Sequence, residues 1–428
     1  MGGRRRQETG YERKDIRKEK MEKEEMMERK EPMEKKEKVE YYNAEPFFCM
    51  RGGLRIRGMQ YLPGGHEEGR RYLAIIVSHG FTGDYTSEES YCREFAKLGY
   101  AAFCFSFCGG SCDLTEEGRK SEGSTTDATI GTEVEDLIAV KDYVAGLAYV
   151  DSGNLILMGC SQGGMVSGLA AARCGKEISK LIMVYPALCI PDHARRGCMG
   201  GADYDVEHVP DIIDCHVVSL GKKFHEEAVG MDAFLELEAY EGPVLILQGM
   251  DDTVVNYSYA VRAKESYRPG QCRLQLIREM GHGVDDWMRE SIVDSVRQFL
   301  LGRREVLTVP IIITRTEEEG KTDYKEVRIY FTGYCDTEFF RGTVLPGGCD
   351  TQKHFEDGTI SIRADYTLEG VDKEGKNCRI HIVNQRVSGE WKPKIETDSR
   401  ALAWIGEADA TAVLEGSSGG PTVRIFFE

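Results

Sequence analysis

Between Tyr41 and Leu301 the sequence alternates short apolar runs with helical patterns, and this alternation restricts the fold more than any other feature. The apolar runs are continuous, as expected for strands that are buried on both faces. They lie at 73–77, 101–107, 155–158, 181–185, 244–247 and 274–277, after a predicted hairpin at 47–61. The helical patterns lie at 87–98, 127–148, 164–174, 257–267 and 285–300. This order predicts an α/β fold over residues 46–302, with a mainly parallel sheet and helices on both of its faces.

Two segments depart from this alternation. Residues 187–241 separate two predicted core strands and are too long for an ordinary loop, so they are predicted to form a cap inserted over the C-terminal edge of the sheet. After Gly302 the pattern changes to that of strands with one buried face. One face of a predicted strand, for example, carries Ile360, Ile362, Ala364, Tyr366 and Leu368. Residues 303–428 are therefore predicted to be a separate all-β domain, a barrel or a sandwich.

Residues 1–45 have a different composition, rich in charge and with few apolar residues, and they are predicted to be a disordered tail. The whole chain has a formal net charge of −17, and the basic and acidic residues of the tail nearly cancel. The remaining acidic body would repel a phosphate backbone, which argues against a nucleic-acid partner.

The location of the protein is predicted from what its sequence lacks. No apolar run approaches the length of a membrane span, and the N-terminus has no apolar signal-peptide core, so no membrane partner is expected. The 14 cysteines follow no disulfide-framework spacing, which fits a reducing cytoplasm. The spacing of Cys104, Cys108 and Cys112 matches no common zinc pattern. The chain also has no phosphate-binding loop or dinucleotide fingerprint, so neither a metal nor a cofactor is predicted.

The segment Gly159-Cys160-Ser161-Gln162-Gly163 lies between a predicted strand and a predicted helix, as in a nucleophile elbow. In such a sharp turn the two glycines keep bulky side chains out of the crossing of strand and helix. The hydroxyl of Ser161 is then exposed at the C-terminal edge of the sheet. The backbone N–H of Gln162, at the helix N-terminus, is predicted to point to the place where an oxyanion would form.

A serine hydroxyl needs a base and an orienting acid, which usually follow it in the order acid, then histidine. Asp252 follows the predicted strand 244–247, and His282 lies on the loop after the last predicted strand. The predicted catalytic triad is therefore Ser161, Asp252 and His282. Asp251 competes for the role of the acid, and Asp285 and Asp286 compete more weakly.

The second oxyanion donor is expected from the loop after strand 73–77. There Gly80 allows a close approach of the backbone, and the N–H of Phe81 is the candidate. His79 is expected to be a buried orienting residue rather than a catalytic one.

Residues 46–302 resemble the α/β-hydrolase superfamily, and within it the bacterial feruloyl (cinnamoyl) esterases. The resemblance rests on HGFTG at 79–83, GCSQGG at 159–164, the insertion after 185–187, GMDDTVV at 249–255 and GHG at 281–283. It implies hydrolysis of hydroxycinnamate esters, with the aromatic acid bound by the insertion. Asp192 would then meet the phenolic hydroxyl, and Phe224 takes the place of a tyrosine common in that family. Cys160 replaces a more usual histidine.

Residues 305–428 resemble the bacterial family named domain of unknown function 3237, through RGTVLPGG at 341–348, KPKI at 392–395 and ALAW at 401–404. The resemblance implies a lipocalin-like β-barrel without assigning it an activity. A ligand pocket and a homodimer surface both remain open.

Together these features predict a cytoplasmic serine carboxylesterase that acts on a small-molecule ester through an acyl-enzyme. A peptidase or a lipase on the same scaffold is one alternative, although the many charged residues of 187–241 do not favour a lipase. The other alternative is a small-ligand-binding protein that turns nothing over.

Overall fold

The computed structural model describes residues 42–65, 69–387 and 389–428. Residues 1–41 of the predicted tail (1–45) lie outside the described residues. Residues 42–45 belong to the first strand, so the first folded element begins four residues before the predicted boundary at 46.

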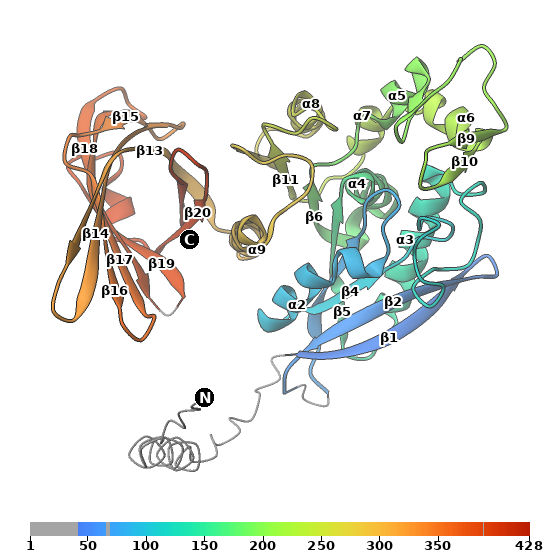
Figure 1. Cartoon of the computed structure of the whole chain (residues 1–428), viewed down its shortest axis with the longest axis horizontal. Coiled ribbons are helices and arrows are strands. Elements are labelled where there is room, and N and C mark those ends of the chain that lie inside the picture. The colour runs from blue at the N-terminus through green and yellow to red at the C-terminus, as the bar shows by residue number, and fades with distance from the viewer. Residues whose placement is uncertain (1–41, 66–68, 388) are drawn as a thin grey trace, which may run out of the picture. The chain divides into compact units, whose positions relative to one another are not determined.

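A twisted sheet forms the centre of the first domain (Figure 1). Its strands lie in the order β1-β2-β4-β3-β5-β6-β11-β12, and every pairing from β4 to β12 is parallel. The strands are β1 (Tyr42–Arg51), β2 (Leu54–Pro63), β3 (Tyr72–Ser78), β4 (Ala101–Phe105), β5 (Val150–Cys160), β6 (Ile178–Val184), β11 (Val244–Gly249) and β12 (Cys272–Ile277). The predicted parallel sheet and its N-terminal hairpin are both confirmed.

Helices cover both faces of this sheet, as predicted. They are α2 (Glu89–Lys97), α3 (Ile130–Ala145), α4 (Gln162–Cys174), α8 (Ser258–Ser266) and α9 (Asp286–Leu300). Successive side chains of a strand point to opposite faces, so β3 contributes Ile76 to one core and Ile75 to the other. The core that contains Ile76 is packed under α3, α4 and α8, and the core that contains Ile75 is packed under α2 and α9.

A cap is inserted between β6 and β11, where the long irregular segment predicted it. Figure 1 shows its elements grouped beyond one end of the sheet. They are α5 (Ile190–Arg196), β7 (Cys198–Met199), β8 (Ala202–Asp203), β9 (Ile212–Asp214), β10 (Ser219–Gly221), α6 (Lys222–Gly230) and α7 (Ala233–Leu237).

The C-terminal region forms a closed antiparallel barrel. Its strands are β13 (Arg304–Gly320), β14 (Tyr324–Asp336), β15 (Phe340–Val344), β16 (Cys349–Phe355), β17 (Ile360–Asp372), β18 (Asn377–Val387), β19 (Glu390–Thr397), β20 (Ala410–Glu415) and β21 (Thr422–Phe427). They follow the order β13-β21-β20-β19-β18-β17-β15-β14-β16, and pairing of β13 with β14 closes the ring. The predicted barrel is confirmed.

Within the described ranges, no helix combines the length and the apolar character needed to cross a membrane.

Candidate active site

The turn that carries Ser161 is sharp and strained. Ser161 has φ 53° and ψ −120°, a conformation that residues with side chains rarely adopt. A Cβ atom on Gly159 would lie 2.0 Å from the carbonyl oxygen of Gly163, and one on Gly163 would lie 2.4 Å from that of Ser78. Both positions therefore require glycine, as the sequence predicted. The turn is also tied to the sheet, since the N–H of Ser161 donates to the carbonyl of Val184 at 2.9 Å.

Three loops at the carboxyl ends of β5, β11 and β12 bring Ser161, Asp252 and His282 together. The Oγ of Ser161 lies 2.9 Å from Nε2 of His282, and Nδ1 of His282 lies 2.9 Å from Oδ2 of Asp252. A carboxylate only accepts hydrogen bonds, so Nδ1 carries a proton in this network. In the neutral ring Nε2 is then an acceptor, correctly placed to take the proton of the serine hydroxyl.

Asp252 is held rigidly in its ionised form. Its side chain is fully buried, and its Oδ1 accepts from the N–H groups of Val254 and Val255 at 2.9 and 2.8 Å. Its Oδ2 also accepts from Nε2 of Gln248 at 3.1 Å. Burial raises the pKa of Asp252, but the hydrogen bonds from His282 and from the two N–H groups lower it more, so the pKa lies below its ordinary value. Asp252, rather than its exposed neighbour Asp251, thus reaches the imidazole.

The loop that carries Phe81 lies against the serine. A Cβ on Gly80 would be 3.2 Å from Cβ of Ser161, so only glycine allows so close an approach without displacing a neighbour. The buried His79 fixes this loop, with Nε2 accepting from the N–H of Phe107 at 3.1 Å and Nδ1 donating to the carbonyl of Gly80 at 2.7 Å. Burial lowers the pKa of His79 to about 4, so its ring is neutral. Phe81 and Gln162, the two predicted oxyanion donors, line the same pocket as Ser161.

The start of α4 is anchored by a buried carboxyl group that the sequence did not reveal. Nε2 of Gln162 lies 2.8 Å from both carboxyl oxygens of Glu133, which belongs to α3. Burial raises the pKa of Glu133 to about 8, with a hydrogen bond from Gln162 opposing the shift. The residue therefore titrates within the range in which the enzyme would be assayed.

We expect Glu133→Gln to flatten the dependence of stability on pH. The folded state holds the proton of Glu133 more tightly than the unfolded state does, so the free energy of unfolding falls as pH rises from 4.5 to about 8. The rise in the pKa of Glu133 corresponds to a loss of at most about 5 kcal/mol in the free energy of unfolding when the group ionises. The melting temperature of the variant, relative to the parent protein, should therefore increase between pH 5.5 and pH 8.5. The exposed Glu135 on the same helix is the matched control, and Glu135→Gln should show no such trend. Equal trends in the two variants would contradict this account.

Ser161 lines two adjoining pockets of different character. A pocket of about 110 Å³ lies under the cap and is mostly apolar, with Ala187, Ile190, Leu220 and Phe224 in its wall. A wider cleft of about 500 Å³ has His282, Tyr185 and Glu88 in its wall. Phe81 and His193 border both pockets. The serine thus lies between a small apolar space and a wider, more polar one.

The two predicted substrate-binding residues occupy different environments. Phe224 is buried and lines the small pocket. Asp192 lies in the wall of neither pocket, and its carboxylate accepts from Arg195 and from the hydroxyl of Tyr259, both at 2.9 Å. A contact of Asp192 with substrate stays a prediction. Its neighbour His193 borders both pockets instead, and burial lowers the pKa of that imidazole.

Glu88 was also missed by the sequence analysis. It is buried, and its Oε2 accepts a hydrogen bond from the thiol of Cys160 at 3.4 Å. Burial raises the pKa of Glu88 to about 7. Cys160, the unusual second residue of the elbow, thus contacts a carboxyl group in the wall of the cleft. Glu88 lies at the start of a helix, where an acidic residue is common, so its sequence position did not distinguish it.

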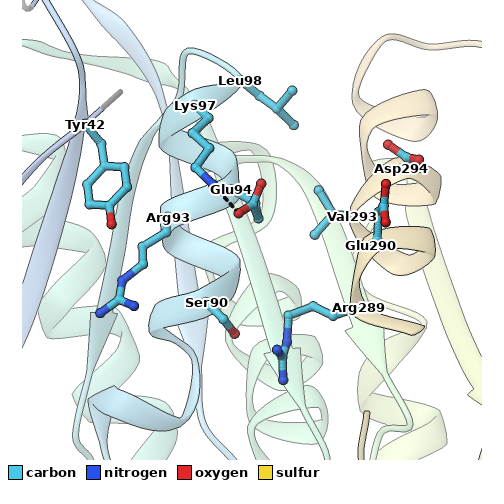
Figure 2. A pocket seen from close by; sticks show the side chains of 10 residues that line it. All are labelled: Tyr42, Ser90, Arg93, Glu94, Lys97, Leu98, Arg289, Glu290, Val293 and Asp294. Atoms are coloured by element: carbon cyan, nitrogen blue, oxygen red, sulfur yellow. Dashed lines mark hydrogen bonds and ion pairs between the residues drawn. The ribbon is translucent and has the colours of Figure 1, made fainter. Parts of the chain in front are cut away.

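A larger hollow of about 610 Å³ lies elsewhere, between α2 and α9. Figure 2 shows charged side chains of both signs along it, among them Arg93, Glu94 and Asp294. Among the described residues of its wall, Ser90 is the one serine and there is no histidine. This groove therefore lacks the nucleophile and base that the cleft at Ser161 combines.

Comparisons with known proteins agree with the fold. A structure from Butyrivibrio proteoclasticus described as ferulic acid bound to Est1E is 27% identical, with a TM-score of 0.53, and covers 60% of this chain and 98% of that one. A second Est1E structure is 26% identical, with a TM-score of 0.50 and the same coverage. The model of the prolyl oligopeptidase family matches residues 89–185. A search of curated proteins found no match. The chain thus has an α/β-hydrolase domain similar to Est1E, followed by the barrel.

Proposed function

We propose that this hydrolase is a serine carboxylesterase that acts through an acyl-enzyme. The observation that supports this most strongly is the continuous hydrogen-bonded series from Ser161 through His282 to Asp252, at the junction of two pockets. The similarity to Est1E, which covers 60% of this chain and 98% of that one, also supports it.

The reaction would follow from these contacts. His282 takes the proton of the Ser161 hydroxyl, and the oxygen attacks the ester carbonyl. The N–H groups of Phe81 and Gln162 stabilise the oxyanion of the tetrahedral intermediate. His282 then protonates the leaving alcohol, and a water molecule, activated in the same way, releases the acid. Asp252 holds the imidazole in the required tautomer and stabilises its cation.

The two pockets support a placement for each half of the ester. His282 must reach the oxygen of the leaving alcohol to protonate it, and His282 lines the wider cleft. The alcohol therefore occupies the wider cleft, from which it can leave to solvent. The acyl group occupies the small apolar pocket beside Phe81 and Gln162.

The size of the small pocket favours a short acyl group. A cavity of about 150 Å³ is enough to hold benzene, and this pocket is smaller, at about 110 Å³. Short aliphatic acyl groups match this volume, whereas a hydroxycinnamoyl group exceeds it. The ferulic acid of the similar Est1E structure supports the aromatic acyl group as the second candidate.

A panel of esters tests the proposal and separates these candidates. It contains nitrophenyl acetate, butyrate and octanoate together with methyl ferulate, each assayed with the parent protein and with Ser161→Ala. Turnover of acetate and butyrate, lost in the variant, is the expected result. Turnover of methyl ferulate at a comparable kcat/KM would instead show that the enzyme accepts an aromatic acyl group. No turnover of any ester would contradict the proposal.

The match to the prolyl oligopeptidase family favours a peptidase as the alternative reaction. A peptide nitroanilide with proline before the scissile bond is therefore added to the panel. If kcat/KM for this amide is close to that for the best ester, the protein is a peptidase rather than an esterase.

We expect Phe224→Ala to shift the acyl preference toward longer chains. Phe224 is 2% exposed and its ring forms part of the wall of the small pocket, so its removal enlarges that space. Each methylene that a pocket rejects or accepts changes the transition-state free energy by about 1–3 kcal/mol. The ratio of kcat/KM for octanoate over acetate should therefore rise by at least about tenfold. Phe234→Ala is the control, because Phe234 lies in α7 of the cap and not in the wall of this pocket. An unchanged ratio in Phe224→Ala would show that the acyl group does not bind in the small pocket.

A further inference from the structure

The barrel is filled at one end and hollow at the other. Near the start of β13 its interior contains fully buried apolar side chains, among them Val309, Leu368 and Ile380. Toward the opposite end of the same strands lies a cavity of about 220 Å³. Its wall is mostly apolar and includes Ile311, Phe331 and Trp391. An aromatic ring fits a space of this size, since about 150 Å³ is enough for benzene.

Three polar side chains in the wall of this cavity have buried atoms without a hydrogen-bond partner. They are Oδ1 of Asp350, Oδ1 of Asn384 and the hydroxyl of Tyr366. Tyr366 is 3% exposed and Asn384 is 2% exposed, so bulk water does not satisfy either of them. Leaving such a group unpaired destabilises the folded state, and native proteins rarely accept three of them in one place.

The strand register explains why these groups converge. Asp350 of β16 is paired with Ala364 of β17, and Ala364 is paired with Asn384 of β18. The three residues thus form one row across neighbouring strands, and Tyr366 follows Ala364 on the same face of β17. Alanine in the centre of the row leaves the space that a larger side chain would fill.

The hydrogen-bonding character of these groups indicates which kind of ligand the cavity binds. Asp350 accepts from Nε2 of Gln352 through its other oxygen, so its remaining oxygen and that of Asn384 are both acceptors that lack a donor. A ligand must therefore supply an O–H or N–H. A ligand carboxylate would bring a second negative charge beside Asp350 and is disfavoured.

We infer that the hollow end of the barrel binds a small uncharged molecule with an apolar body about the size of one ring and a hydroxyl group that donates to Asp350 or Asn384. The site is independent of the esterase reaction proposed above, because it lies within one domain and includes none of the residues that line the cleft at Ser161. Most binding pockets in proteins share its composition of apolar wall and a few convergent polar groups.

Isothermal titration calorimetry of the full chain tests this inference with four probes of similar shape. They are 4-ethylphenol, the donor-free 4-ethylanisole, 4-ethylbenzoate and 2-phenylethylammonium. We expect 4-ethylphenol to bind at one site and at least tenfold more tightly than the anisole and the benzoate. Tighter binding of the ammonium ion would overturn the hydroxyl assignment, and no binding of any probe would mean that only water occupies the cavity.

Two variants locate the binding. Ala364→Phe fills the cavity and should abolish the binding of 4-ethylphenol, whereas Ser361→Phe, at an exposed position of the same strand, should leave it unchanged. Asn384→Leu removes an acceptor and should reduce the preference for the phenol over the anisole at least threefold. Unaltered cooperative thermal unfolding shows that each variant is folded. Binding of 4-ethylphenol that persists in a folded Ala364→Phe protein would contradict the inference.

Discussion

Replacing Ser161 by alanine lowers kcat for nitrophenyl butyrate by about 10⁴-fold or more in our account, with little change in the melting temperature. In the proposed reaction the hydroxyl oxygen forms the acyl-enzyme, and it lies 2.9 Å from Nε2 of His282. The remaining rate would come from the oxyanion donors and from substrate binding alone. Steady-state and single-turnover kinetics measure the effect.

Ser90→Ala is the control for this substitution. Ser90 lies in the larger groove between α2 and α9 and should be replaceable with less than a twofold change in kcat (Figure 2). A protein in which Ser161→Ala retains activity while Ser90→Ala loses it would move the active site to the groove and contradict the account.

Asp252→Asn is expected to lower kcat by about 10³–10⁴-fold while leaving KM nearly unchanged. An amide at this position can present its NH₂ group to Nδ1 of His282, and this favours the tautomer in which Nε2 carries the proton and cannot accept one from Ser161. The loss of the carboxylate also removes the negative charge that stabilises the imidazolium. The effect should appear across the whole pH range of the assay, since the acid itself is not titrated there.

Asp251→Asn provides the matched control, because it changes the adjacent residue by the same chemistry. Asp251 is exposed, whereas the side chain of Asp252 is fully buried against His282. We expect less than a threefold effect on kcat. A larger loss of kcat in Asp251→Asn than in Asp252→Asn would show that Asp251, and not Asp252, is the acid of the triad.

The sequence predicted the central parts of the site because parallel strands place their carboxyl ends at one edge of the sheet. Ser161, Asp252 and His282 each follow a continuous apolar run, so their convergence depends only on recognising those runs as strands of one sheet. The glycines of the elbow were informative for a similar reason, since a local steric requirement is visible in the local sequence. The barrel was predictable from strict alternation, as in Ile360 to Leu368.

Other parts of the site depend on contacts that no local pattern encodes. Glu133 meets Gln162 from a different helix, 29 residues away, and Glu88 meets Cys160 across 72 residues. The cap was predicted only as an insertion, and the sequence singled out Asp192, whereas its neighbour His193 borders both pockets. Adjacent side chains of an α-helix point about 100° apart, and the orientation of this short helix is set by packing. Asn384 did carry a signal, because it occupies the inward position of the alternation in β18 after Ile380 and Ile382.

The most direct test of the central claim is the site of covalent labelling by a fluorophosphonate, which reacts with serines activated by a histidine base. The account predicts one adduct per chain, located by peptide mass spectrometry on Ser161, and at least a hundredfold slower labelling in His282→Ala. A folded protein that remains unlabelled, or that is labelled at another serine, would show that Ser161 is not an activated nucleophile and would contradict the account.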